Sequence, residues 1–407
     1  MTSELDKQRF SDLLQKIAET IDLTENQYEK ATERYKAVGS FLAEKGTLLA
    51  PFEPHVMVQG SIRTGTPIRP LTEDEGFDVD LTCVLKKCPY PVKQKEIKGL
   101  FEKRLRENAN YNRMLDKEKR RCWRLLYSDA PTFHLDIVPA IPEGYDWLLM
   151  QGIKEKYAKH AITITDNKHK GYEKYLYEND LPKSNTEGYA LWFLDVMEEQ
   201  AASIRGILER EISKMGKVEK VPEYKVRTPL QRGVQLMKRH RDIRFSDSNM
   251  SEFKPVSIVI STLAAKAYEK VMQSTGSTLF YDIVLKMVDE MPNFIEERNG
   301  KYYILNPVDT GENFADKWNE PETRYYATTF FSWHSQFRKD ITAAFLHEKD
   351  LQNAGESLKQ KFGDRAVSSA MQLMGFIAAV PNTPRSNEEK AAALFATSQS
   401  GHKPWSK

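Results

Sequence analysis

Two aspartates in a strongly apolar segment are the first candidates for chemistry. Asp78 and Asp80 are two residues apart in Phe77–Leu85, a run that predicts a β-strand, so their side chains leave the same face. Neighbouring carboxylates repel each other and are costly to desolvate unless a cation lies between them. Mg²⁺ is commonly bound by such carboxylates together with substrate phosphates. Alone, the pair is also compatible with an exposed edge strand carrying two solvated aspartates.

A third aspartate strengthens the interpretation of the first two. Asp136 lies in Phe133–Val138, a second predicted strand that we expect Pro139 to end, and it shares one face with His134. A carboxylate in an otherwise apolar strand requires a partner. If the two strands are neighbours, three carboxylates cluster, which fits a two-metal site for phosphoryl transfer.

A turn that could bind phosphate precedes these strands. Gln59, Gly60 and Ser61 follow a short apolar segment that predicts a strand. Glycine allows the backbone to approach a phosphate closely, and serine adds a hydroxyl and an N–H group. These three residues are candidates for phosphate binding, although a Gly-Ser pair is also common in ordinary turns.

Two further candidates lie on predicted helices in the second half. Lys238 borders the apolar stripe of a helix that begins at Thr228, so its ammonium group can reach a phosphate pocket from the edge of the core. Arg239 is predicted to face solvent. The alternative for Lys238 is membership of a solvated basic run. Ser257 opens the next predicted helix, and a helix N-terminus favours anions.

The elements around these residues predict an α+β fold. Strands and helices are interleaved in the first half, whereas the second half is mostly helical. The N-terminal helical pattern breaks near Asp22, restarts at a capping box formed by Thr24 and Gln27, and is expected to brace a larger body from outside. The expected units are N-terminal helices bracing both lobes (1–50), a catalytic core (51–220), a helical domain (221–380) and a loosely ordered tail (381–407). The expected elements also include strand 123–126 and helices 95–108, 188–214, 256–268, 278–291 and 333–347.

Composition excludes several classes of protein. The 407 residues are 40 % hydrophobic and 29 % charged, which is typical of globular chains with two or three packed units. No apolar run approaches the roughly 18 residues of a membrane span, and the N-terminus does not resemble a secretory signal. Three cysteines form no disulfide framework, so we expect a cytoplasmic protein. With 60 basic and 58 acidic residues, a broad surface for long nucleic acids is not expected.

The motifs together resemble a known family. The Gly60-Ser61 turn, the Asp78 and Asp80 pair and Asp136 resemble the polymerase-β-like nucleotidyltransferases. Four further stretches are similar to bacterial CD-NTases, the cyclic-oligonucleotide synthases of antiphage signalling and relatives of animal cyclic GMP–AMP synthase. The similarity runs from about residue 10 to 350. The four stretches are Ser184–Phe193, Thr228–Asp242, Lys254–Tyr268 and Leu305–Trp318.

This resemblance implies a fold and a set of roles. The fold would be a nucleotidyltransferase core, a mixed sheet flanked by helices, with an N-terminal brace helix and a C-terminal helical domain. Asp78, Asp80 and Asp136 would bind two Mg²⁺ ions, with Mn²⁺ as a possible substitute. Lys238 and Ser257 match the lysine and serine that contact the donor triphosphate in the family.

The resemblance also implies substrates and leaves alternatives open. The substrates would be nucleoside triphosphates (ATP, GTP, UTP or CTP), condensed into a cyclic di- or trinucleotide with release of pyrophosphate. We expect a monomer without a membrane partner, and an activating partner that the sequence does not identify. The zinc ribbon of the animal relative has no counterpart in the sequence. Two alternatives remain: a nucleotidyltransferase that modifies an RNA, protein or small molecule, and a catalytically silent nucleotide- or RNA-binding scaffold.

Overall fold

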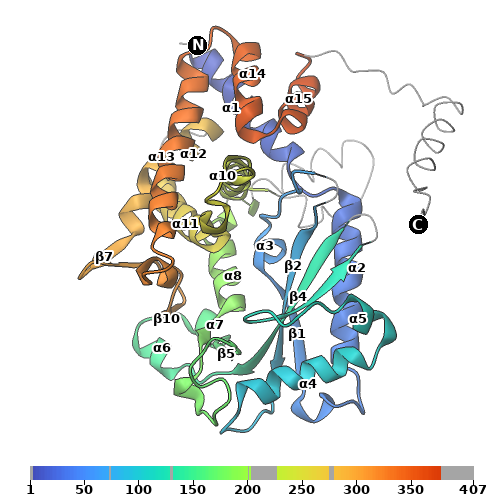
Figure 1. Ribbon diagram of the computed structural model, residues 1–407. Coiled ribbons are helices and arrows are strands. Elements are labelled where there is room, and N and C mark those ends of the chain that lie inside the picture. Colours follow the sequence, from blue (N-terminus) through green and yellow to red (C-terminus); the bar gives the residue numbers. More distant parts are fainter. Residues whose placement is uncertain are drawn as a thin grey trace, which may run out of the picture.

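The chain forms two large hydrophobic cores. One lies against a mixed sheet and the other among helices, and Figure 1 shows the sheet and the helices that surround them. The computed structural model describes residues 3–72, 75–128, 132–199, 201–202, 227–274 and 279–376. The expected tail, 381–407, therefore lies outside the described residues. None of the described helices is long and apolar enough to cross a membrane.

The six-stranded sheet carries the residues predicted to bind metal. Its order is β1-β2-β4-β5-β6, and β3 pairs with β4 as well. Only β2 and β4 run parallel to each other, so the sheet is mixed and the predicted α+β fold is confirmed. The strands are β1 (Pro54–Gln59), β2 (Phe77–Leu85), β3 (Trp123–Tyr127), β4 (Phe133–Pro142), β5 (Ile162–Ile164) and β6 (Lys183–Ser184).

The prediction that Pro139 ends its strand is wrong. β4 continues to Pro142, and Pro139 is still paired in register with Cys83 of β2. On its other edge β4 pairs with β3 up to Ile137 and with β5 from Ala140 onward. Pro139 thus falls between the two ladders on that edge, a place where a missing N–H is tolerated.

One face of the sheet is apolar and is covered by helices. Alternate residues of β2, among them Val79 and Leu81, are fully buried in a cluster with Val38 and Phe101. The intervening residues Asp78 and Asp80 therefore leave the opposite face. The helices of this core are α2 (Glu25–Leu42), α4 (Gln94–Arg106) and α5 (Ala109–Met114).

The second core consists of helices from both ends of the chain. Phe10 and Leu13 of α1 are fully buried among residues of the C-terminal helices, so α1 is an integral part of this core rather than an external brace. The predicted helix 188–214 ends early, at Asp195, and its part beyond residue 202 lies outside the described residues. The helices are α1 (Glu4–Thr20), α8 (Thr186–Asp195), α10 (Pro229–Phe245), α11 (Ser257–Ser274), α12 (Phe280–Glu290), α13 (Tyr325–Leu346), α14 (Leu351–Phe362) and α15 (Asp364–Leu373).

Short elements complete the described fold. The hairpin of β9 and β10 contributes residues to the cavity described below. The hairpin of β7 and β8 projects from the helical side (Figure 1). These elements are α3 (Gly60–Thr64), α6 (Asp146–Met150), α7 (Glu155–Ala158), β7 (Glu296–Arg298), β8 (Lys301–Tyr303), β9 (Leu305–Asn306) and β10 (Asp309–Asn313).

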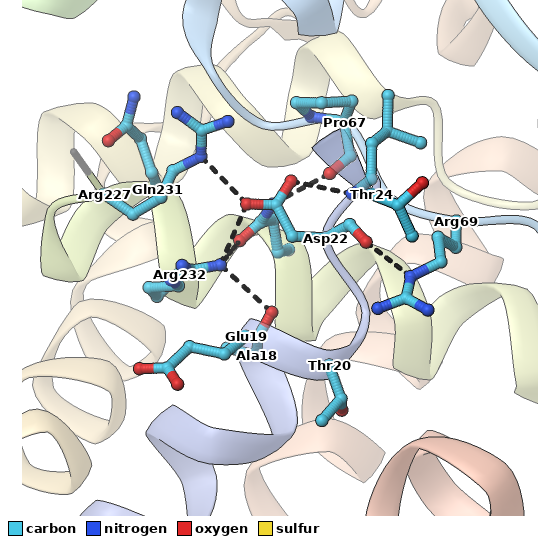
Figure 2. Close-up of polar contacts among 12 residues, drawn as sticks. Ala18, Glu19, Thr20, Asp22, Thr24, Pro67, Arg69, Arg227, Gln231 and Arg232 are labelled. Carbon is cyan, nitrogen blue, oxygen red and sulfur yellow. Dashed lines mark hydrogen bonds and ion pairs between the residues drawn. The ribbon is translucent and has the colours of Figure 1, made fainter. Parts of the chain in front are cut away.

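A buried polar network joins the two cores at the elbow between α1 and α2. Asp22 lies at this elbow, and the predicted capping box of Thr24 and Gln27 restarts the chain as α2. The Asp22 carboxylate accepts hydrogen bonds from Arg227 Nε at 3.1 Å and Arg232 Nη1 at 3.1 Å (Figure 2). Arg232 belongs to α10, so the elbow holds this helix in place.

Candidate active site

Four polar residues form one row across four neighbouring strands. Gln59 of β1 is paired with Asp80 of β2, Asp80 with Asp136 of β4, and Asp136 with Arg124 of β3. The prediction that the two aspartate strands are neighbours is confirmed. Asp78 lies two residues before Asp80, on the same face of β2, and is paired with His134 of β4. The register of the sheet therefore places the three predicted carboxylates on one face of two neighbouring strands.

Asp80 is the carboxylate without a counter-ion. No hydrogen bond or ion pair of its side chain occurs among the described residues. Burial, followed by repulsion from Asp78 and Asp136, raises the pKa of Asp80 to about 7. A divalent cation would relieve this repulsion, and carboxylate oxygens suit Mg²⁺, so the donor chemistry fits such an ion.

Gly60 makes room for this carboxylate. Its φ of +65° lies in the left-handed region, and a Cβ atom at this position would be 2.3 Å from Asp80 Oδ2. Gly60 begins α3, the short helix that follows β1. The sequence suggested close approach to a phosphate as the reason for glycine; the structure adds the approach of the Asp80 side chain. Gln59 accepts a hydrogen bond from Thr82 Oγ1 at 2.6 Å.

Asp136 already has a partner that the sequence reasoning missed. Arg124 donates from Nε and Nη2 to the two carboxylate oxygens of Asp136, at 2.6 and 2.8 Å. Arg124 Nη2 also lies 3.7 Å from Asp78 Oδ1. Burial alone would raise the pKa of Asp78, but the hydrogen bond from His134 and the charge of Arg124 lower it. Within the described part of the chain, no three His, Cys, Asp or Glu side chains form a ready-made metal site.

Lys238 lies on a buried polar face of α10. This face donates hydrogen bonds to the backbone of residues 64–69, here called the strap. Lys238 Nζ donates to the carbonyl of Thr66 at 2.8 Å. The other donors to strap carbonyls are Gln231, Gln235 and Arg239. Arg239 is only 5 % exposed, so the prediction that it faces solvent is wrong: the strap covers it.

The environment of the Lys238 ammonium group would favour a nearby anion. Burial, assisted by the charge of Arg241, lowers the pKa of Lys238 to about 8. A buried cation gains most from a charge-assisted hydrogen bond. Ser257 begins α11 as predicted, and its hydroxyl oxygen accepts a hydrogen bond from Arg241 Nη1 at 2.9 Å. The Ser257 proton is therefore directed away from Arg241.

A cavity of about 750 Å³ connects the sheet with the helices. Asp136 does not line this cavity, and its side chain is 13 % exposed. Arg124 and Arg241 were missed, although each gave a signal: one is the lone charge in a predicted strand, the other an arginine on an apolar stripe. The predicted residues that do line the cavity are Gln59, Gly60, Ser61, Asp78, Asp80, Lys238 and Ser257.

The chain is a nucleotidyltransferase, as its similarity to known proteins shows. Residues 54–139 match the family model described as "Cyclic GMP-AMP synthase DncV-like, nucleotidyltransferase domain". The chain is 31 % identical to a c-di-GMP synthase of Roseivirga ehrenbergii, over 90 % of this chain and 87 % of the relative. It is 23 % identical to the cyclic dinucleotide synthase CdnG of Bradyrhizobium diazoefficiens, over 88 % of this chain and 82 % of the relative.

Solved structures show the same fold. The CD-NTase CdnG of Bradyrhizobium diazoefficiens in complex with GTP matches with a TM-score of 0.63 and 18 % identity, covering 90 % of this chain and 99 % of CdnG. CdnC of E. coli MS115-1 with ATP matches with a TM-score of 0.56 and 14 % identity, covering 86 % of this chain and 96 % of CdnC. The chain belongs to the DncV-like CD-NTases, enzymes that synthesise cyclic oligonucleotides.

Proposed function

We propose that the protein joins two or three ribonucleoside triphosphates into a cyclic nucleotide with 3′–5′ or 2′–5′ linkages, and that GTP is among its substrates. The choice of GTP rests on the relative named c-di-GMP synthase and on the GTP complex of CdnG. In each step a ribose hydroxyl oxygen attacks the α-phosphorus of a triphosphate. The bond between the α-phosphorus and the oxygen that bridges it to the β-phosphorus breaks, and pyrophosphate leaves. The hydroxyl proton passes to a base.

The carboxylate row supports a role in binding divalent metal ions, which CD-NTases generally use. Asp78 and Asp80 would hold two Mg²⁺ ions, and Asp136 would share the one beside the attacking hydroxyl; Mn²⁺ is a possible substitute. When bound, these ions neutralise charge on the phosphates and on the leaving pyrophosphate. Asp136 would orient the hydroxyl or accept its proton.

Residues on two sides of the cavity support triphosphate binding. Ser61 follows Gly60, the first residue of α3, and both line the cavity with Gln59 next to the carboxylate row. Lys238 and Ser257 would donate to phosphate oxygens, with Lys238 exchanging its bond to the Thr66 carbonyl for a phosphate. The observation that carries this proposal is the alignment of Asp80 and Asp136 in one register row beside the cavity that also contains Lys238.

The biological setting belongs to the proposal as well. We place the catalytic core in residues 51–220 and the helical domain in 221–380, with helices from 1–50 contacting both and 381–407 as a loosely ordered tail. The enzyme would act as a cytoplasmic monomer in antiphage (CBASS) signalling. One structural neighbour, CdnC, is a complex with a HORMA protein, so a protein partner is one activator to test.

The test is product formation from labelled nucleotides. The full chain is incubated with ³²P-labelled ATP, GTP, CTP and UTP and with Mg²⁺ or Mn²⁺. We expect a phosphatase-resistant product whose mass identifies a cyclic nucleotide, and none from the variant Asp78→Asn/Asp80→Asn. A label transferred to an RNA, protein or small molecule would instead indicate the alternative transferase. Metal-dependent nucleotide binding without turnover would indicate a scaffold.

A further inference from the structure

We propose that Arg124 is a positioning residue that holds Asp136 away from metal ions until a nucleotide arrives. Arg124 and Asp136 face each other in the register of β3 and β4, so the backbone itself places the two side chains side by side. The guanidinium group grips both carboxylate oxygens, at 2.6 and 2.8 Å. A bidentate contact of this kind is among the strongest that a carboxylate makes. The inference rests on the metal site proposed above.

Asp80 and Asp136 therefore have different surroundings before any ligand binds. Asp80 lines the cavity and has no partner among the described residues, whereas Asp136 is engaged through both oxygens and does not line the cavity. A metal ion approaching Asp136 meets the positive charge of Arg124 at contact distance. The same charge lies 3.7 Å from Asp78, so it also weakens attraction of a cation to that carboxylate.

A bound nucleotide changes this balance. Its phosphates bring negative charge into the cavity and offer the guanidinium group another partner, because arginine binds phosphate as readily as carboxylate. Asp136 is then released to the metal ion beside the attacking hydroxyl. The consequence is an order of events in which the free protein binds metal weakly and the complete metal set forms only with substrate present.

The experiment measures Mn²⁺ binding to the nucleotide-free full chain by electron paramagnetic resonance. Arg124→Gln removes the charge and keeps a similar length, and we expect it to bind Mn²⁺ about tenfold more tightly than wild type. Arg124→Lys keeps the charge without the two-pronged contact, so its Mn²⁺ affinity should lie between those of wild type and Arg124→Gln. Arg120→Gln is the matched control, because Arg120 is paired with Asp166 and does not contact the carboxylate row.

Adding a non-reactive GTP analogue gives a second readout that needs no variant. Wild type should gain Mn²⁺ affinity strongly on adding the analogue, whereas Arg124→Gln should gain much less. Equal or weaker Mn²⁺ binding by Arg124→Gln without nucleotide would overturn the inference, as would full Mn²⁺ binding by the free wild type. If Asp78→Asn/Asp80→Asn binds Mn²⁺ as wild type does when the analogue is present, the proposed metal site itself is wrong.

Discussion

The two walls of the cavity position their charges by different means. On the sheet wall, backbone pairing sets Asp80, Asp136 and Arg124 in one row. On the helical wall, Lys238 is placed by a hydrogen bond to the strap, and Ser257 by a hydrogen bond from Arg241. A register is set by many backbone hydrogen bonds, whereas the helical wall depends on a few individual side chains.

The difference also appears in the electrostatics. The sheet wall holds several carboxylates, and burial together with repulsion from Asp78 and Asp136 raises the pKa of Asp80 to about 7. The helical wall concentrates positive charge in a buried position, which lowers the pKa of Lys238 to about 8. On each wall, burial and neighbouring like charges disfavour the charged form of the side chain. A metal-bound triphosphate would offset this cost on both walls. Such a ligand would bring a cation to the carboxylates and an anion to Lys238.

The largest effect on activity should come from the sheet wall. Asp80→Asn should lower the rate of product formation by about 10³-fold or more, because a lost metal ligand removes several kcal/mol of transition-state stabilisation. The melting temperature of the metal-free variant should rise at pH 8. The raised folded pKa means that ionised Asp80 destabilises the fold progressively as pH rises from about 4 to 7, and Asn removes that penalty. The exposed Asp247→Asn should change neither quantity; a destabilised Asp80→Asn would contradict the assigned repulsion.

The glycine beneath Asp80 should show the next largest effect. Gly60→Ala should reduce activity by about 10–100-fold, because the new Cβ atom displaces the Asp80 carboxylate. Gly46→Ala is a matched control: Gly46 has a φ of +75° but nothing within 4 Å of its Cβ position. Both variants should lose about 1 kcal/mol of stability from backbone strain. Equal activities for the two variants would show that the contact with Asp80 does not matter.

The sheet wall was largely predictable from sequence, and the helical wall only in part. Alternation within apolar strands identified Asp78, Asp80 and Asp136 together with their common face. The partner of Asp136 could not be assigned, because strand order and register depend on contacts distant in sequence. The prediction for Arg239 was wrong because helical periodicity separates apolar from polar positions but does not show which polar face another segment covers. The strap covers that face with backbone carbonyls, which leave no apolar pattern.

The helical wall should respond to pH through Lys238. Lys238 carries its charge below pH 8 and loses it above, so the affinity for a non-reactive triphosphate analogue should fall by about fivefold between pH 8 and 9. Lys238→Arg should bind with little change over this range, because a guanidinium group stays charged. Calorimetric titration of both proteins measures the effect. A decline of the same size in Lys238→Arg would assign the titration to another group.

The buried network around Asp22 links the two walls. Disrupting it should have the smallest effect on activity and the largest effect on stability. Asp22 is buried, and it joins the α1–α2 elbow to Arg232 of α10 and, through its backbone carbonyl, to Arg69 of the strap at 2.5 Å (Figure 2). Asp22→Ala leaves buried arginines without their carboxylate and should cost about 3 kcal/mol in denaturant unfolding. Activity well below the melting temperature should fall only a few-fold.

Glu19→Ala is the control for the Asp22 variant, since Glu19 lies in the same elbow and pairs with Lys16 near the surface. It should change stability by no more than about 0.5 kcal/mol. If Asp22→Ala instead abolishes activity while it remains folded, the elbow sets the geometry between the two walls directly. The helical wall would then depend on one buried carboxylate, in contrast to the distributed hydrogen bonds that hold the sheet wall.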